Sequence, residues 1–251
     1  MFKSLIFFAR FFIFWLLFFA IDKFVFLFIF HKKLRNIPLT EKVASFYHAL
    51  RLDLSMTAYI AIAPLFVFIY WYLTKKQTVN ISWVSIYNKI LLIIFSTLSV
   101  INFNIYREWG SKVNVRALSF AIDTPNEAFA SSASSPILLS ISVLIILIGI
   151  GFYLNFLINK KSINFVKTPA LVKIITSLLL LGINFLLIRG GIGVAPNNQS
   201  MAYFSKYEIL NHASLNTEWN LISSILASKK TKKNPYLYLD QAIAKKQVGE
   251  L

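Results

Sequence analysis

The sequence contains no cysteine among its 251 residues, and it has few acidic side chains. Without cysteine, disulfides, thiolate metal sites and cysteine nucleophiles are all excluded. Only 10 Asp and Glu residues stand against 26 Lys and Arg, which gives a formal net charge of +16. In a soluble protein this excess would suggest nucleic-acid binding. Hydrophobic residues make up 57% of the chain, however, so we expect the basic residues to face anionic lipid headgroups and expect no nucleic-acid partner.

The sequence also has no recognisable catalytic motif. Its three histidines, His31, His48 and His212, lie in separate segments, and none has a further ligand three or four residues after it. The glycine-rich residues 189–193 lack the lysine and the serine or threonine of a phosphate-binding P-loop. No Gly-x-Ser-x-Gly nucleophile motif occurs either. We therefore assign no catalytic residue, no metal ligand and no cofactor to this chain.

Long apolar runs dominate what is present. An α-helix needs about 20 apolar residues to cross about 30 Å of hydrocarbon, and residues 54–73 and 136–158 are the clearest runs of this kind. Lipid offers no partner for an unpaired backbone N–H or C=O, so such runs must be helical. The first run follows basic residues as a signal peptide would, but no cleavage pattern comes after it. We expect an all-α polytopic membrane protein with about five transmembrane helices plus interfacial helices. The spans are expected near residues 5–30, 52–73, 88–106, 136–158 and 170–188.

The composition changes after the fifth run and divides the chain into two parts. Residues 1–189 are expected to form a five-helix transmembrane domain, and residues 190–251 a polar juxtamembrane linker. Three of the chain's eight glycines fall in residues 189–193, which favours the end of a helix there.

In the linker, Trp219, Ile222 and Leu226 follow helical spacing and Asn216 can cap the helix. We expect this amphipathic helix to lie on the outer leaflet. The next residues form a basic run that is expected to anchor on acidic headgroups, through Lys229, Lys230, Lys232 and Lys233.

The orientation of the chain decides which compartment the linker occupies. An odd number of spans places the two ends on opposite sides of the membrane. Either orientation puts nine Lys and Arg residues on each side before the linker, so the count does not decide. The loop at residues 160–167, KKSINFVK, is basic without any acid, whereas the loop after the third span offsets its basic residues with acids. This difference favours a cytoplasmic N-terminus and an extracytoplasmic C-terminal tail.

Charged residues at the ends of the spans are candidates for a lipid-headgroup site or a polar pocket. A lone charge at mid-bilayer costs about 2.5–3.5 kcal/mol, so such residues usually have a partner or a watery cavity. Arg51 and Asp53 lie two residues apart and should point to different faces of their helix. Two interpretations stay open for this pair. Either both face the headgroups, or they line a pocket shared with Arg107 or Glu108. Arg189 closes the fifth span and is a further candidate.

Asp22 and Lys23 fall within the first long run. If that span covers residues 5–21, both lie at its outer edge, and the lysine reaches outward to the headgroups.

The segment RGGIGVAPNNQSMAYFSKYEILNHASLNTEWNLISSI, residues 189–225, resembles the membrane-exit segment of the lipoteichoic acid synthase-like phosphoglycerol transferases. These enzymes belong to the sulfatase and alkaline phosphatase superfamily. RLDLS at residues 51–55 and YREWG at residues 106–110 also resemble signatures of that family. The matching linker motif consists of Gly190, Gly191, Asn211, Asn216, Trp219 and Asn220.

The resemblance implies a multi-pass plasma membrane protein with a cytoplasmic N-terminus and an extracytoplasmic tail. It implies membrane lipids and a lipid-linked substrate as partners. In that family the tail leads into a soluble catalytic domain with a threonine nucleophile and a divalent metal. No residue of this chain matches the nucleophile or the metal ligands, so the resemblance implies a membrane-anchoring domain that is inactive alone and works with a catalytic domain in cis.

Two other functions stay open from the sequence. The first is a small lipid or solute transporter whose pocket uses Arg51, Asp53, Arg107 and Arg189. The second is a non-catalytic membrane assembly subunit that only binds a partner.

Overall fold

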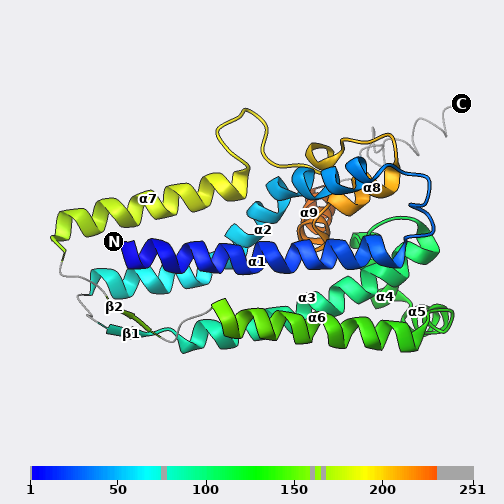
Figure 1. Ribbon diagram of the computed structural model, residues 1–251, viewed down its shortest axis with the longest axis horizontal. Coiled ribbons are helices and arrows are strands. Elements are labelled where there is room, and N and C mark those ends of the chain that lie inside the picture. The colour runs from blue at the N-terminus through cyan, green and yellow to red at the C-terminus, as the bar shows by residue number, and fades with distance from the viewer. Residues whose placement is uncertain (1, 75–77, 159–161, 165–167, 231–251) are drawn as a thin grey trace, which may run out of the picture.

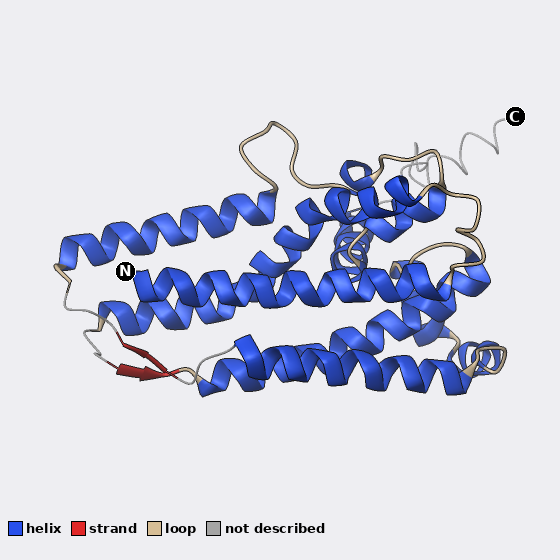
Figure 2. Cartoon of the chain, viewed as in Figure 1, coloured by secondary structure: helices blue, strands red, loops and turns tan. Residues whose placement is uncertain are grey.

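The chain folds into a bundle of long helices closed at one end by shorter helices (Figure 1). The computed structural model describes residues 2–74, 78–158, 162–164 and 168–230. These residues are almost entirely helical, as the cartoon in Figure 2 shows, which confirms the all-α expectation. The elements in chain order are α1 (Phe2–Ile29), α2 (Leu39–Leu73), β1 (Thr78–Asn80), α3 (Ser82–Trp109), α4 (Val115–Asp123), α5 (Pro125–Ser132), α6 (Ile137–Ile158), β2 (Ser162–Asn164), α7 (Ala170–Arg189), the 3-10 helix η1 (Gln199–Ala202), α8 (Glu208–Ser214) and α9 (Thr217–Lys230).

Five helices of the described part are long and apolar enough to cross a membrane: α1, α2, α3, α6 and α7. They coincide with the five expected spans, so the chain has the build of a multi-pass membrane protein. The helix α2 begins at Leu39, well before the expected span at residue 52. Its 35 residues reach about 52 Å, so part of it extends beyond a bilayer core of about 30 Å.

Two short strands mark one end of the bundle. β1 follows α2, and β2 follows α6, and the two pair antiparallel with Val79 opposite Ile163. The connection from α2 to α3 and the connection from α6 to α7 therefore lie at the same end, which also holds the start of α1 (Figure 1). We call this the hairpin end. The opposite end holds α4, α5, α8 and α9, and we call it the tail end.

The centre of the bundle is built from aromatic side chains of α1. Phe11, Phe14 and Trp15 are fully buried, with an exposed fraction of 0%. The rings of Trp15 and Phe95 on α3 lie 5.4 Å apart. The Trp15 Nε1–H donates a hydrogen bond of 3.3 Å to Asn88 of α3. Such a polar link between apolar helices fixes their relative position, because lipid offers the same groups no partner.

A close approach between α3 and α6 depends on a glycine. A Cβ atom added at Gly151 would lie 2.7 Å from Cδ2 of the buried Leu92. We expect Gly151→Ala to displace that side chain and to destabilise the bundle by about 1–3 kcal/mol. Gly149→Ala is the matched control, because its Cβ would meet nothing within 4 Å. Thermal unfolding of both variants in one detergent checks this, and equal melting temperatures would contradict the tight packing at Gly151.

Candidate functional site at the tail end of the bundle

The segment after α7 folds back into the end of the bundle. Leu210 and Ser214 of α8 are fully buried, and Glu218 and Asn220 at the start of α9 are 2% and 3% exposed. The Asn216 side chain accepts a hydrogen bond of 3.0 Å from the Trp219 backbone N–H, which confirms the expected helix cap. The start of this helix is buried, and α9 packs against α2, α3 and α4.

The exposed apolar residues expected on this helix lie farther along it. Ile222 and Leu226 are 39% and 53% exposed, so only the later turns of α9 present an apolar surface. Of the expected basic run, Lys229 and Lys230 are in α9, whereas Lys232 and Lys233 lie outside the described residues.

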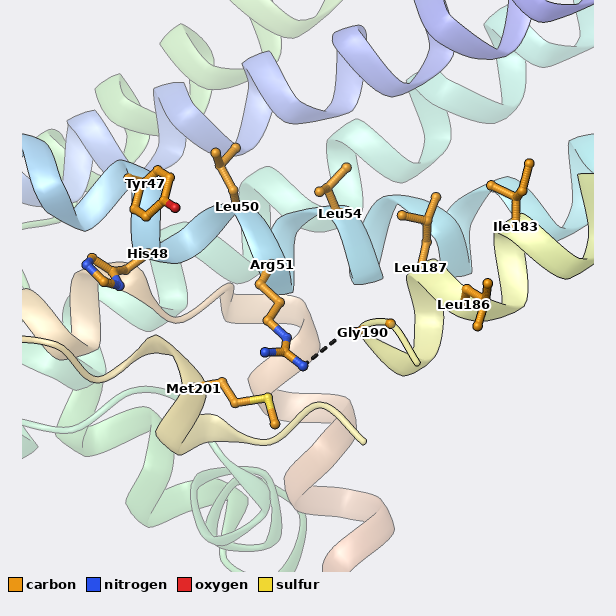
Figure 3. Close-up of a pocket in the computed structure, with 11 residues that line it drawn as sticks. Tyr47, His48, Leu50, Arg51, Leu54, Ile183, Leu186, Leu187, Gly190 and Met201 are labelled. Carbon is orange, nitrogen blue, oxygen red and sulfur yellow. Dashed lines mark hydrogen bonds between the residues drawn. The ribbon is translucent and has the colours of Figure 1, made fainter. Parts of the chain in front are cut away.

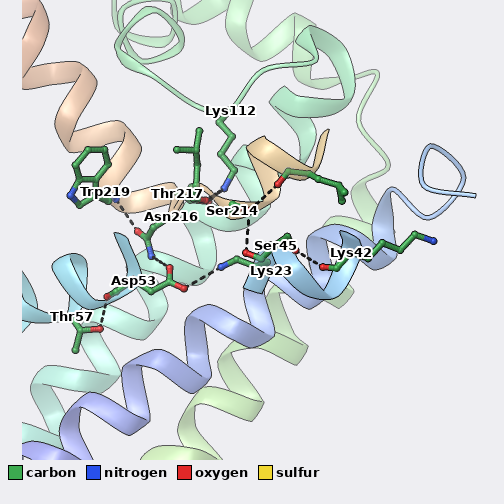
Figure 4. A network of polar contacts seen from close by, with 12 residues as sticks. Lys23, Lys42, Ser45, Asp53, Thr57, Lys112, Ser214, Asn216, Thr217 and Trp219 are labelled. Atoms are coloured by element: carbon green, nitrogen blue, oxygen red, sulfur yellow. Dashed lines mark hydrogen bonds and ion pairs between the residues drawn. The ribbon is translucent and has the colours of Figure 1, made fainter. Parts of the chain in front are cut away.

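A buried ion pair lies under the start of α9 (Figure 4). The Lys23 ammonium of α1 is 3.2 Å from the Asp53 carboxylate of α2, and both side chains are about 5% exposed or less. The Asn216 amide donates a hydrogen bond of 3.0 Å to the second Asp53 oxygen. The tail therefore adds a hydrogen bond to an ion pair that two membrane helices form.

The structure corrects two expectations about these charges. Lys23 does not reach outward to headgroups, because α1 continues to Ile29 and packing against α2 turns this position inward. Asp53 does not face headgroups either, since it is only 3% exposed and points into the bundle. Arg51 and Asp53 do point to different faces, as their spacing predicts.

Lys112 brings a second buried charge to the same region. Its ammonium donates hydrogen bonds to the Leu215 carbonyl oxygen and, over 3.0 Å, to the Thr217 hydroxyl. Burial lowers the pKa of Lys112 to about 8, although the charge of nearby Asp22 partly opposes this effect. Asp22 of α1 is itself 8% exposed. Sequence reasoning missed Lys112 because it lies in a polar loop, where a lysine is ordinarily solvated.

Glu218 is the least satisfied charged group of the site. Within the described residues, neither of its carboxyl oxygens has a hydrogen-bond partner, and the side chain is 2% exposed. Burial, and then the negative charge of Asp22, raise the pKa of Glu218 to about 8. The sequence did not indicate that Glu218 is buried. An acid in the first turn of a helix is normally solvated and is stabilised by the helix dipole.

Amide side chains tie the loop between α3 and α4 to the tail. The Asn102 side chain accepts a hydrogen bond of 3.0 Å from the Val113 N–H, and the Asn220 amide donates one of 2.9 Å to the Val113 carbonyl. Gln199 of η1 donates a hydrogen bond of 2.7 Å to the Asn220 side-chain oxygen. Asn220, a residue of the expected linker motif, thus links three separate segments.

The other motif asparagine and a histidine hold α8 in place. The Asn211 side chain accepts hydrogen bonds of 2.9 Å from the N–H groups of Phe204 and Ser205, which closes the turn before α8. The His212 ring lies 3.1 Å from the Tyr106 hydroxyl of α3. Burial lowers the pKa of His212, although Glu208 at 3.7 Å partly opposes this effect. The neutral imidazole is therefore favoured.

An arginine of α2 binds the residues that follow the end of α7, and we call this contact the Arg51 clasp. Gly190 ends the helix with a φ of 90°, a left-handed conformation that glycine adopts without strain, as the glycine-rich sequence predicts. Arg51 donates from Nη2 to the Gly190 carbonyl and from Nε to the Asn197 side-chain oxygen, over 2.9 Å each. Two residues of the sequence-based prediction, Arg51 and Gly190, are therefore in direct contact.

A groove of about 580 Å³ opens beside this clasp, between α2 and α7 (Figure 3). Its walls are mostly aliphatic, and Arg51 supplies its charged group. No acidic residue is among those that line it, which are Tyr47, His48, Leu50, Arg51, Leu54, Ile183, Leu186, Leu187, Gly190, Gly191 and Met201.

The remaining predicted site residues lie elsewhere. Arg107 donates to the Asn104 side chain over 3.2 Å, and Glu108 lines a different groove, between α3, α4, α5 and α6. The structure therefore does not bring Arg107 or Glu108 to Arg51 and Asp53, which contradicts the second of the two interpretations left open by the sequence. Arg189 donates to the carbonyls of Gly193 and Val194 over 3.1 Å each, so it folds back on the exit loop.

The chemistry available at the tail end is that of charge pairing and binding. In the part of the chain that the structure describes, no three His, Cys, Asp or Glu side chains gather closely enough to hold a metal ion. The contacts of this site attach the tail to the bundle, and Arg51 lies beside an apolar groove. Comparisons with protein-family models, with curated proteins and with solved structures gave no match.

Proposed function

We propose that this chain is the membrane-anchoring domain of a lipoteichoic acid synthase-like phosphoglycerol transferase. In this role it holds an extracytoplasmic catalytic domain beside a lipid-linked substrate in the plasma membrane. The divalent metal and the threonine nucleophile of such an enzyme belong to that catalytic domain.

One observation carries this proposal beyond the sequence resemblance. The segment that resembles the family, residues 189–225, is bound by side chains of the membrane helices. Arg51 contacts Gly190, and Asp53 contacts Asn216. A flexible tether would need neither contact, because any membrane anchor raises the concentration of an attached domain near the surface. These two contacts, of which the one between Asp53 and Asn216 is buried, support an anchor that also sets the position and the orientation of the attached domain.

Transfer from lipid vesicles provides the test. A catalytic domain of this family, joined behind residue 251 of the full chain, should transfer phosphoglycerol about tenfold faster than the same domain on an unrelated single-span anchor, since orientation adds to tethering. Equal rates would overturn the proposal. The joined domain must also lie outside the cell, so a reporter enzyme fused at the same point that is active only in the cytosol would overturn it as well.

A glycine pair tests whether the α7 exit matters. A Cβ added at Gly190 would collide with the Asn197 Oδ1 atom, whereas one added at Gly193 meets nothing within 4 Å. Gly190→Ala should therefore break the Arg51 clasp and lower the transfer rate severalfold, and Gly193→Ala should leave the rate unchanged. If both variants keep the full rate, the clasp does not position the catalytic domain.

A transporter is the second candidate, because buried acids and lysines in membrane proteins often mark ion or substrate pathways. Five buried charged residues of this kind lie at the tail end: Asp22, Lys23, Asp53, Lys112 and Glu218. This function requires that proteoliposomes containing the full chain take up solute or move labelled lipid, and that Asp53→Asn abolishes the flux. Flux that is the same with and without the wild-type protein would remove it.

A further inference from the structure

We propose that the groove between α2 and α7 binds one anionic phospholipid, with the phosphate on Arg51 and an acyl chain along the aliphatic walls. This inference does not depend on the proposed transferase function. It rests on the position of the groove, on its apolar walls and on the positive charge of Arg51.

The position of the groove matches a headgroup next to hydrocarbon. The 20 residues of α7 end at Arg189, which is about the length needed to cross a bilayer core. Arg51 contacts the next residue, Gly190, so its guanidinium lies where α7 leaves the hydrocarbon. The volume of about 580 Å³ is within the usual range for ligand sites, about 300–1,000 Å³.

The walls of the groove are apolar and open to the outside of the bundle. Leu50 of α2 is 43% exposed, and Ile183 and Leu186 of α7 are 54% and 38% exposed. Figure 1 shows α7 at the edge of the bundle, and the exposure of these three wall residues indicates that the groove is open to the surroundings. In a membrane those surroundings are lipid chains, which makes an acyl chain the natural occupant.

The arginine carries a positive charge that its neighbours do not neutralise. Its two hydrogen bonds go to a neutral carbonyl and a neutral amide oxygen, and none of the lining residues is acidic. A guanidinium has five N–H donors in a fixed fork, so donors stay available for a phosphate. The two bonds also hold the side chain in one orientation, which reduces the entropy lost when a ligand binds. Charge complementarity therefore selects an anionic headgroup.

Native mass spectrometry of the detergent-solubilised full chain tests the proposal. Phosphatidylglycerol should bind about tenfold more tightly than phosphatidylcholine, whose headgroup carries its own cation, and soluble glycerol phosphate should bind far more weakly than either lipid. Arg51→Gln should reduce the affinity for phosphatidylglycerol about tenfold, the usual order for loss of a charge-assisted contact. Arg116→Gln, which removes an exposed charge at the same end, should change the affinity less than twofold.

A second pair of variants tests the acyl-chain wall and leaves the Arg51 contacts in place. Ile183→Ser should weaken lipid binding severalfold, because Ile183 lines the groove. Phe185→Ser is the matched control, since Phe185 is similarly exposed on α7 but does not line the groove. The proposal would be overturned if the two variants of either pair changed the affinity equally. It would also be overturned if phosphatidylglycerol bound no more tightly than phosphatidylcholine, or no more tightly than glycerol phosphate.

Discussion

Asp53→Ala is expected to destabilise the folded chain by about 3–5 kcal/mol, the usual cost of leaving one partner of a buried ion pair without its counter-charge. The substitution leaves the Lys23 ammonium in a site that is 4% exposed. It also removes the acceptor for the Asn216 amide, so the tail loses one of its hydrogen bonds to α2. Thermal unfolding in a mild detergent, followed by size-exclusion chromatography of the heated sample, should show the loss.

A double variant separates the charge from the packing. Replacing Lys23 with Met and Asp53 with Leu removes both charges and keeps apolar volume, and such exchanges are often neutral or stabilising. We therefore expect the double variant to recover most of the stability lost in Asp53→Ala. A double variant as unstable as the single one would show that the ion pair is not the cause.

Glu218→Gln is expected to change the pH dependence of stability. The pKa of Glu218 in the folded chain, about 8, is above its ordinary value of 4.5, so the folded state binds the proton more tightly than the unfolded state. The stability that this proton contributes is complete below about pH 4.5 and is lost as the pH rises through about 8. Glutamine has no proton to lose. The variant should therefore be more stable than the parent above pH 8, and the difference should disappear towards pH 4.5.

Lys112 acts in the opposite direction at higher pH. Its pKa of about 8 is below the ordinary value of 10.5, so between these values the unfolded state binds more protons. Stability should then rise with pH above about 8. The two groups together predict a minimum of stability near pH 8. Melting temperatures of the parent, Glu218→Gln and Lys112→Met across this range test both effects.

The exposed Glu127 provides the control for the pH experiment. Glu127→Gln removes an acid at the same end of the molecule without touching the buried site, so its melting curve should follow that of the parent at every pH. A parallel shift in Glu127→Gln and Glu218→Gln would assign the effect to net charge, not to burial.

Much of the fold can be predicted from short stretches of sequence. The five spans were predictable because hydrocarbon accepts only runs of apolar residues in a helix. The end of α7 was predictable from Gly190, and the start of α9 from Asn216, since left-handed caps and side-chain caps depend on a few adjacent residues. The separation of Arg51 from Asp53 was predictable from helical geometry alone.

The partners of the charged residues could not be predicted in the same way. Asp53 pairs with a lysine 30 positions earlier and with an asparagine 163 positions later. Of the two residues considered as neighbours of Asp53, Glu108 lines a separate groove and Arg107 donates to Asn104. Glu218 and Lys112 looked like ordinary solvated residues.

Hydropathy and local capping thus predict five membrane-spanning helices, the end of α7 and the start of α9, because each of these depends on neighbouring residues and the solvent. Which charges are buried together, and that the tail closes the bundle, depended on how α1, α2 and α3 pack, since burial of a charge is a property of every element around it and not of its own helix.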